Sequence, residues 1–284
     1  MLPSSDSLQG KVALVTGANT GIGLVTGREL CRGGARVFMA CRSTVSGEAA
    51  VQSIKAAIPH AKVELLSLDL GDLDSVRRCA ASFLAKGLPL HVLVNNAGLA
   101  GGKGMTTSGF ELAFGTNHIG HFLLVQLLLD RLKASAPARI VTVASRAHYR
   151  VPAWDWDTLE KPTKSLTGLD EYGVSKLANV LFSAELAKRL QGTGVTTYSL
   201  HPGVVASDVW RSVPWPIRPL IKRWMITVEE GALTTLHCAT SSEVTHESGL
   251  YYDKCKSKLP SVLGRDAQLA ESLWKRSEAW VQPA

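Results

Sequence analysis

The sequence predicts an α/β protein in which helices cover both faces of a largely parallel sheet, and three observations lead to this fold class. Short apolar segments alternate with longer helical segments over most of the chain. The apolar segments are near-continuous runs of Val, Leu and Ile, as expected for parallel strands buried on both faces. A glycine-rich turn joins the first such strand to the first helix. Together these features predict a doubly wound sheet that binds its ligand at the carboxyl ends of the strands.

The elements follow one another in the order that such a sheet requires. We expect seven strands, at Lys11–Thr16, Arg36–Ala40, Lys62–Ser67, Val92–Asn95, Arg139–Ala144, Thr196–His201 and Gly249–Tyr252. Helices are expected at Gly21–Arg32, Ser46–Ile58, Leu73–Ala85, Glu111–Lys133, Asp170–Gln191 and Val228–Thr240. No Pro/Ser/Gly-rich linker, internal repeat or low-complexity tract divides the chain, so residues 1–284 are predicted to form a single domain.

The turn after the first strand reads Thr16-Gly17-Ala18-Asn19-Thr20-Gly21-Ile22-Gly23. Its glycines allow a tight turn and close approach of the backbone to a pyrophosphate, whose charge is favoured at a helix N-terminus. The spacing Gly-x-x-x-Gly-x-Gly departs from the general dinucleotide fingerprint Gly-x-Gly-x-x-Gly. Taken alone, the glycines leave an ordinary strand–helix turn as the alternative.

A second pattern places a phenol and an ammonium at i and i+4, at Tyr172 and Lys176. On a helix both side chains lie on one face. A nearby ammonium favours tyrosinate, so Lys176 is expected to lower the pKa of Tyr172 towards a value useful for proton transfer. Tyr-x-x-x-Lys by itself arises often by chance, and it gains weight only beside the glycine turn.

These two motifs, together with Asn95-Asn96-Ala97-Gly98 after a strand, resemble the short-chain dehydrogenase/reductase family. The resemblance extends from Gly10 to about Trp274. Longer strings, among them Asn117-His-Ile-Gly-His-Phe and His201-Pro-Gly-Val-Val, are similar to the retinol dehydrogenases 11 to 14. The resemblance implies a Rossmann fold and hydride transfer between a nicotinamide cofactor and a carbonyl or alcohol.

The expected cofactor is NADP(H). An NAD-specific site usually offers a carboxylate to the ribose 2′-OH, but positions 40 to 42 hold no acid, and Arg42 could pair with a 2′-phosphate. A solvated surface charge at Arg42 is the alternative. The resemblance also implies that Asp69 binds the adenine amino group and that the Pro202-Gly203 turn holds the carboxamide. The expected cofactor-binding residues are Gly17, Asn19, Thr20, Gly21, Ile22, Gly23, Arg42, Asp69, Leu70, Asn95, Ala97, Gly98, Tyr172, Lys176, Pro202, Gly203, Val204 and Ser207.

Four residues are expected to carry the chemistry: Asn117, Ser145, Tyr172 and Lys176. Ser145 ends a strand and would hydrogen-bond the substrate carbonyl, and Tyr172 would exchange its proton with the substrate oxygen. Lys176 would bind the nicotinamide ribose, while Asn117 would interrupt its helix and hold a water of the proton relay. A Ser/His hydrolase built on Ser145 is disfavoured because the flanking residues lack the Gly-x-Ser-x-Gly pattern.

Two segments are expected to border the substrate. The stretch between Ser145 and Tyr172 is longer than is usual in classical members of the family, as it also is in the resembled retinol dehydrogenases. Its Trp154 and Trp156 would either touch an apolar substrate or, as we favour, cover the rim. Residues 205–228 resemble the mobile lid of the family. The combined apolar and basic character of this lid suits a greasy substrate and leaves open peripheral contact with an anionic membrane surface.

The expected function is reduction of retinaldehyde or a similar lipophilic aldehyde. Reduction of steroid or xenobiotic ketones, and cofactor binding with little turnover, remain alternatives. A net charge of +7 raises the question of nucleic acid, but the basic residues are scattered and no groove-reading motif accompanies them. The five cysteines show no metal-ligand spacing, so no metal is expected. With no signal peptide or membrane anchor recognised, we expect a cytoplasmic protein, peripheral at a membrane at most, and leave homodimer formation open.

Overall fold

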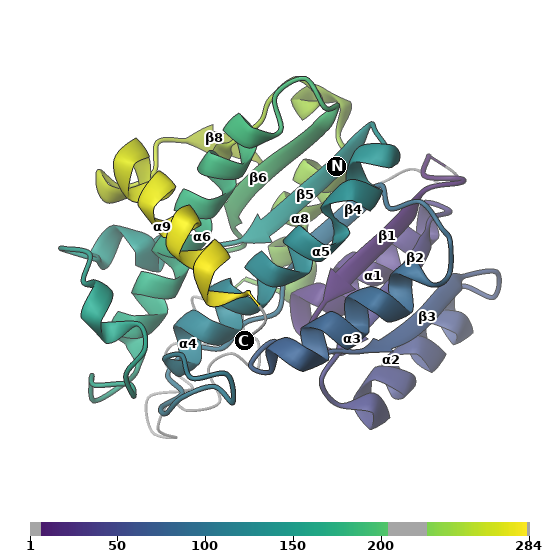
Figure 1. Ribbon diagram of the computed structural model, residues 1–284. Helices are drawn as coiled ribbons and strands as arrows, with labels where there is room; N and C mark the ends of the chain where they lie inside the picture. The colour runs from purple at the N-terminus through teal and green to yellow at the C-terminus, as the bar shows by residue number, and fades with distance from the viewer. Residues whose placement is uncertain (1–6, 204–225, 283–284) are drawn as a thin grey trace.

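The computed structural model describes residues 7–203 and 226–282 (Figure 1). Within these residues, eight strands form one sheet in the order β3-β2-β1-β4-β5-β6-β7-β8. All neighbouring pairs from β3 to β7 are parallel, and only β8 runs antiparallel, to β7. The Rossmann-type α/β fold is therefore confirmed.

The predicted number of seven strands is wrong by one. The additional strand, β8 (Lys256–Lys258), is three residues long and fully exposed, so it carries no apolar pattern that would mark it in the sequence. It pairs with β7 (Leu250–Asp253) across a tight turn in which Lys254 and Cys255 adopt φ values of 54° and 59°. The lysines on this edge strand discourage pairing with another chain.

The remaining strands lie within one or two residues of their predicted ends. Their bounds are Val12–Thr16 (β1), Arg36–Cys41 (β2), Lys62–Ser67 (β3), Val92–Asn95 (β4), Ala138–Val143 (β5) and Val195–His201 (β6). The helices are Gly21–Arg32 (α1), Thr44–Ala57 (α2), Leu73–Leu84 (α3), Leu112–Phe114 (α4), Gly120–Ala134 (α5), Leu169–Arg189 (α6), Val228–Thr240 (α8) and Ala267–Trp280 (α9).

Side-chain alternation along the strands divides the core into two layers. On β1, Val12 and Leu14 pack with α3, α5, α6 and α9, whereas Ala13 and Val15 pack with α1, α2 and α8. Figure 1 shows these two groups of helices on opposite sides of the sheet. Because β1 lies between β2 and β4, the strand order reverses at this point, and such a switch point is where doubly wound sheets bind ligands.

The predicted helix at Glu111–Lys133 is interrupted, as expected for the segment that contains Asn117. A π-helical turn at Gly115–Ile119 separates α4 from α5. Among the described residues, the combined stretch Leu112–Ala134 is long and apolar enough to cross a membrane, yet 72% of its apolar window is buried within the fold. It therefore has the character of a core helix packed on the sheet.

The C-terminal helix α9 was not among the predicted elements. Asp266 caps it by accepting hydrogen bonds from the backbone N–H groups of Gln268 and Leu269, each at 2.9 Å. Its Trp274 stacks on Phe182 of α6 with ring centroids 5.8 Å apart, and the Arg189 guanidinium lies 4.4 Å from the Trp274 ring. These contacts, together with the buried Ala270 and Leu273 on the same face of the helix, hold α9 on α6.

Candidate active site

The hydroxyls of Ser145 and Tyr172 meet at the carboxyl end of β5. Ser145 follows this strand, and its Oγ accepts a hydrogen bond from the Ala147 N–H at 3.2 Å, which begins a 3-10 turn at Arg146–Arg150. Tyr172 lies in the first turn of α6, and its phenol is close enough to the Ser145 side chain for that hydroxyl to act on the pKa of Tyr172. The fold thus joins two groups that the sequence places far apart.

Lys176 lies one turn after Tyr172 and is almost fully buried. Its Nζ donates a 2.8 Å hydrogen bond to the carbonyl oxygen of Val143 and lies 5.7 Å from the centroid of the Tyr172 ring. Burial disfavours the ammonium and lowers the pKa of Lys176 to about 7.

The expected lowering of the Tyr172 pKa is wrong for this structure. Burial of the phenol raises the pKa of Tyr172, and the hydrogen bond from Ser145 opposes that shift only in part. The physical reason is that desolvation of the buried phenol disfavours its charged form and is the largest cause of the shift. The phenol is consequently protonated at neutral pH.

Asn117 ties the site together from the π-helical turn. Its side-chain Oδ1 accepts from the Leu99 N–H at 2.9 Å, and its Nδ2 donates to the Leu99 carbonyl at 3.0 Å and to Ser175 Oγ at 2.9 Å. Gly98 fits against this group, because a Cβ there would lie 3.2 Å from Asn117 Oδ1 and 3.3 Å from Lys176 Nζ. The expected catalytic residues therefore lie close together in space, although they come from separate segments of the sequence.

The glycine turn is packed tightly against the loop that follows β4. Gly17 has a φ of +62°, and a Cβ on it would lie 2.8 Å from the Cα of Ala97. A Cβ on Gly23 would overlap the Gly17 carbonyl oxygen. Asn96, which was absent from the predicted set, donates from Nδ2 to the Thr16 carbonyl at 2.8 Å. Its position inside the Asn-Asn-Ala-Gly motif was the available signal.

The beginning of α1 and the end of β2 supply groups that fit a dinucleotide. Gly21 and Ile22 form the first turn of α1, where backbone N–H groups favour an anion, and Thr20 precedes them in an extended conformation. Asn19 is half-buried and donates to Ser46 Oγ at 3.0 Å. Arg42 follows β2 directly and is exposed. A close-packed glycine turn beside an exposed guanidinium suits a phosphate-rich cofactor.

The predicted adenine-binding residues lie at the end of β3. The Asp69 Oδ1 accepts from the Gly71 N–H at 2.9 Å, which fixes the carboxylate beside the strand end. The backbone of Leu70 packs against Gly120 of α5, where no Cβ would fit. The Asn95 side chain is turned into the core, with Nδ2 3.3 Å from Thr142 Oγ1, which leaves only its backbone for a ligand.

The Pro202-Gly203 turn follows β6 at the same edge of the sheet. Gly203 has a φ of +99°, and a Cβ on it would overlap the Ile226 side chain. Ile226 belongs to the end of the expected lid at 205–228. Val204, Ser207 and the lid residues up to 225 lie outside the described residues.

The tryptophans between Ser145 and Tyr172 face the protein rather than an open site. Trp154 lies 6.5 Å from Phe114 and 5.3 Å from Trp156, and the Arg276 guanidinium lies 4.3 Å from the Trp156 ring. These contacts favour the expectation that Trp154 and Trp156 cover the rim of the site over direct contact with a substrate.

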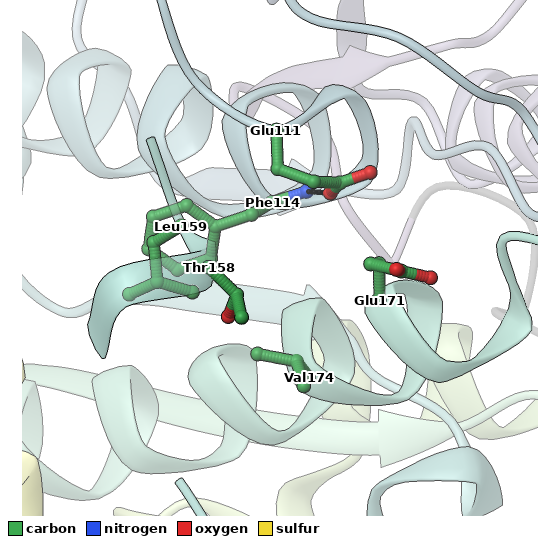
Figure 2. Close-up of a pocket in the computed structure, with 6 residues that line it drawn as sticks. All are labelled: Glu111, Phe114, Thr158, Leu159, Glu171 and Val174. Carbon is green, nitrogen blue, oxygen red and sulfur yellow. Dashed lines mark hydrogen bonds between the residues drawn. The ribbon is translucent and has the colours of Figure 1, made fainter. Parts of the chain in front are cut away.

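Figure 2 shows the cavity under this segment, lined by Glu111, Phe114, Thr158, Leu159, Glu171 and Val174. Its volume of about 10 Å³ would admit about one water molecule, so it is too small for an organic substrate.

The surroundings of His148 and the grouping of possible metal ligands bear on two other kinds of site, a Ser/His hydrolase pair and a metal centre. His148 Nδ1 lies 2.6 Å from the main-chain carbonyl oxygen of Ser145 rather than its hydroxyl, and its Nε2 accepts from the Ser261 N–H. A hydrolytic Ser/His pair is therefore not formed. In residues 7–203 and 226–282, no three His, Cys, Asp or Glu side chains gather in a way that could hold a metal ion.

The comparisons with known proteins agree with this geometry. Residues 11–156 match the family model described as short chain dehydrogenase. The chain is 46% identical to human retinol dehydrogenase 12 over 95% of its own length and 86% of the relative's. It is 43% identical to human dehydrogenase/reductase SDR family member 13, over 96% and 73% of the two chains.

A crystal structure of an uncharacterised protein from Mycobacterium paratuberculosis has 34% identity and a TM-score of 0.78, and the match covers 99% of this chain and 95% of that one. Family match, identity and fold lead to one conclusion. This chain belongs to the short-chain dehydrogenase/reductase family of oxidoreductases, which use nicotinamide cofactors.

Proposed function

We propose that this chain is an NADP(H)-dependent reductase of lipophilic aldehydes, with retinal as the substrate class. The observation that carries the proposal is the Ser145 and Tyr172 side chains brought together at the end of β5, with the buried Lys176 beside Tyr172. The 46% identity to human retinol dehydrogenase 12 supports the choice of aldehyde.

Reduction of an aldehyde needs a hydride at carbon and a proton at oxygen. The bound nicotinamide supplies the hydride. Tyr172 donates its phenolic proton to the developing alkoxide, and the Ser145 hydroxyl stabilises the negative charge by hydrogen bonding to the same oxygen. With its pKa raised by burial, Tyr172 holds its proton at neutral pH and is in the acid form that reduction requires.

Lys176 acts on the tyrosinate that remains after proton transfer. When it is protonated, its ammonium offsets the new negative charge, and its fixed place against Val143 keeps it beside the phenol. The same ammonium is suited to the ribose hydroxyls of the cofactor. Asn117 holds the loop at Leu99 and helix α6 in register around both groups.

NADP(H) is preferred to NAD(H) because Arg42 is exposed at the end of β2, where residues 40 to 42 supply no carboxylate. A guanidinium attracts a 2′-phosphate, whereas a carboxylate would favour an unmodified ribose. The cytoplasmic location, peripheral membrane contact through residues 205–228 and homodimer formation remain predictions.

The test is the loss of NADPH absorbance with all-trans-retinal, for the wild type and Tyr172→Phe. Removal of the phenolic proton should lower the rate by on the order of 100-fold or more while NADPH still binds. Turnover that persists in Tyr172→Phe would contradict the mechanism. A wild type that binds NADPH but leaves retinal unchanged would refute the retinal assignment, and steroid ketones would be assayed next.

A further inference from the structure

His121 lies one helical turn after Asn117 and is 1% exposed. Its Nδ1 is 2.9 Å from the carbonyl oxygen of Asn117, and its Nε2 is 2.8 Å from the Thr16 hydroxyl. A carbonyl can only accept, so Nδ1 must carry the proton and Nε2 must accept from Thr16. Burial lowers the pKa of His121 to about 4, in agreement with this neutral form.

The Thr16 hydroxyl is anchored to the cofactor side of the site. Its oxygen accepts from the N–H groups of Asn96 at 3.0 Å and Ala97 at 2.9 Å, both in the loop against the glycine turn. Its hydrogen is better placed for His121 at 2.8 Å than for the Val94 carbonyl at 3.4 Å. His121 is therefore connected, through Thr16, to the loop that packs against the glycine turn.

On the other side of His121, the hydrogen bonds continue through Asn117 to α6, the helix that carries Tyr172. Asn117 Nδ2 donates to Ser175 Oγ at 2.9 Å, and Ser175 Oγ donates to the main-chain carbonyl of Tyr172 at 2.8 Å. Thr16, His121, Asn117 and Ser175 are all at most 1% exposed. A fully paired buried network is rigid, because breaking any bond leaves a polar group unsatisfied.

We propose that His121 is a positioning residue that couples the cofactor turn to the Tyr172 helix. The inference rests on the proposed function, but it assigns a role to a side chain that touches neither cofactor nor aldehyde. The two ring nitrogens of His121 bond to Thr16 and to the π-helical turn. Because the imidazole is planar and rigid, it fixes the separation between these two partners. Movement at either end is therefore transmitted to the other.

The alternative is that His121 is a core histidine with a structural role alone. A second buried histidine, His118, provides a matched control. His118 lies on the neighbouring turn, is also 1% exposed, and is also kept neutral by burial. Its side-chain partners, however, are Ser277 of α9 at 3.3 Å and Asn179 of α6, and neither of them belongs to the glycine turn. A purely structural histidine at 121 should behave as His118 does.

The experiment compares His121→Phe, His121→Gln and His118→Phe. NADPH affinity is measured by fluorescence titration, and kcat and KM for retinal are measured at saturating NADPH. We expect His121→Phe to lower both kcat and NADPH affinity by about 10-fold, and His121→Gln, which retains a donor and an acceptor, to recover part of each loss. His118→Phe should stay within about twofold.

Ser175→Ala keeps the test decisive if His121→Phe does not fold. It removes the last bond of the line and should lower kcat by about 10-fold with NADPH affinity unchanged. The proposal is overturned if Ser175→Ala retains full kcat, or if His121→Phe matches His118→Phe in both kcat and NADPH affinity. Should the wild type fail on retinal, the proposed function fails, while NADPH affinity still measures the coupling.

Discussion

The Lys176 ammonium and the Asn179 amide share one acceptor, the main-chain carbonyl of Val143, at 2.8 and 3.2 Å. Val143 ends β5, two residues before Ser145, whereas Lys176 and Asn179 belong to the helix that carries Tyr172. One carbonyl oxygen therefore joins the two elements whose hydroxyls meet in the site. The geometry of the Ser145–Tyr172 pair depends on this contact.

Charge on Lys176 should control the pH dependence of the free enzyme. Its pKa is lowered by burial to about 7, so the ammonium is present below that pH and lost above it. We expect kcat/KM for NADPH, which reports the free enzyme, to fall as pH rises through about 7. A Lys176→Arg variant, weaker at neutral pH, should lack this descending limb. A limb of unchanged position in Lys176→Arg would show that another group titrates.

Addition of one methyl group at Gly23 should abolish cofactor binding. A Cβ there overlaps the Gly17 carbonyl oxygen, so Gly23→Ala must open the turn. Gly27 lies on the same helix, and a Cβ there would lie 3.8 Å from Val37, an ordinary contact. We expect Gly23→Ala to weaken NADPH binding by on the order of 100-fold and Gly27→Ala to bind normally. Calorimetric titration of both variants checks this, and equal affinities would contradict it.

Replacement of Arg42 should change cofactor preference rather than catalysis. Loss of a charge-assisted pair with a phosphate costs about 1.5–3 kcal/mol, so Arg42→Leu should weaken NADPH binding by about 10- to 100-fold and leave NADH binding unchanged. Arg265→Leu, which removes an exposed cation at the other end of the chain, controls for net charge. If Arg42→Leu weakens both cofactors equally, Arg42 does not read the 2′-phosphate.

Buried neutral histidines should make the fold acid-sensitive. Burial lowers the pKa of His118 to about 3 and that of His121 to about 4, whereas both titrate near 6.5 when unfolded. Between these values the unfolded chain binds more protons, so stability is fully present above pH 6.5 and falls as pH falls. Each histidine costs up to about 1.4 kcal/mol per pH unit in that window.

Urea unfolding between pH 7.5 and 5, values chosen to span about one unit above and 1.5 units below the unfolded histidine pKa, measures this slope. His118→Phe should flatten the decline by roughly one histidine's share. A decline that is equally steep in His118→Phe would mean that other groups cause the acid sensitivity.

Several site residues were predictable because they belong to local patterns. Gly17, Gly21 and Gly23 follow a strand at a fixed spacing, and Tyr172 and Lys176 occupy one helical face. His121 and Ser175 lie in the same recognised segments, yet nothing in their spacing indicates a partner. Their roles arise from hydrogen bonds to Thr16, Asn117 and Tyr172, which the fold brings together.

The sequence by itself determined the α/β fold class, most element positions and the strand ends that carry the site. Periodicity and turn chemistry act over a few residues, so they can be read along the chain. The tertiary structure alone decided the antiparallel β8, the docking of α9 on α6 and the direction of the Tyr172 pKa. These depend on burial and on partners far apart in sequence. Desolvation in particular is a property of the assembled core, which no local pattern contains.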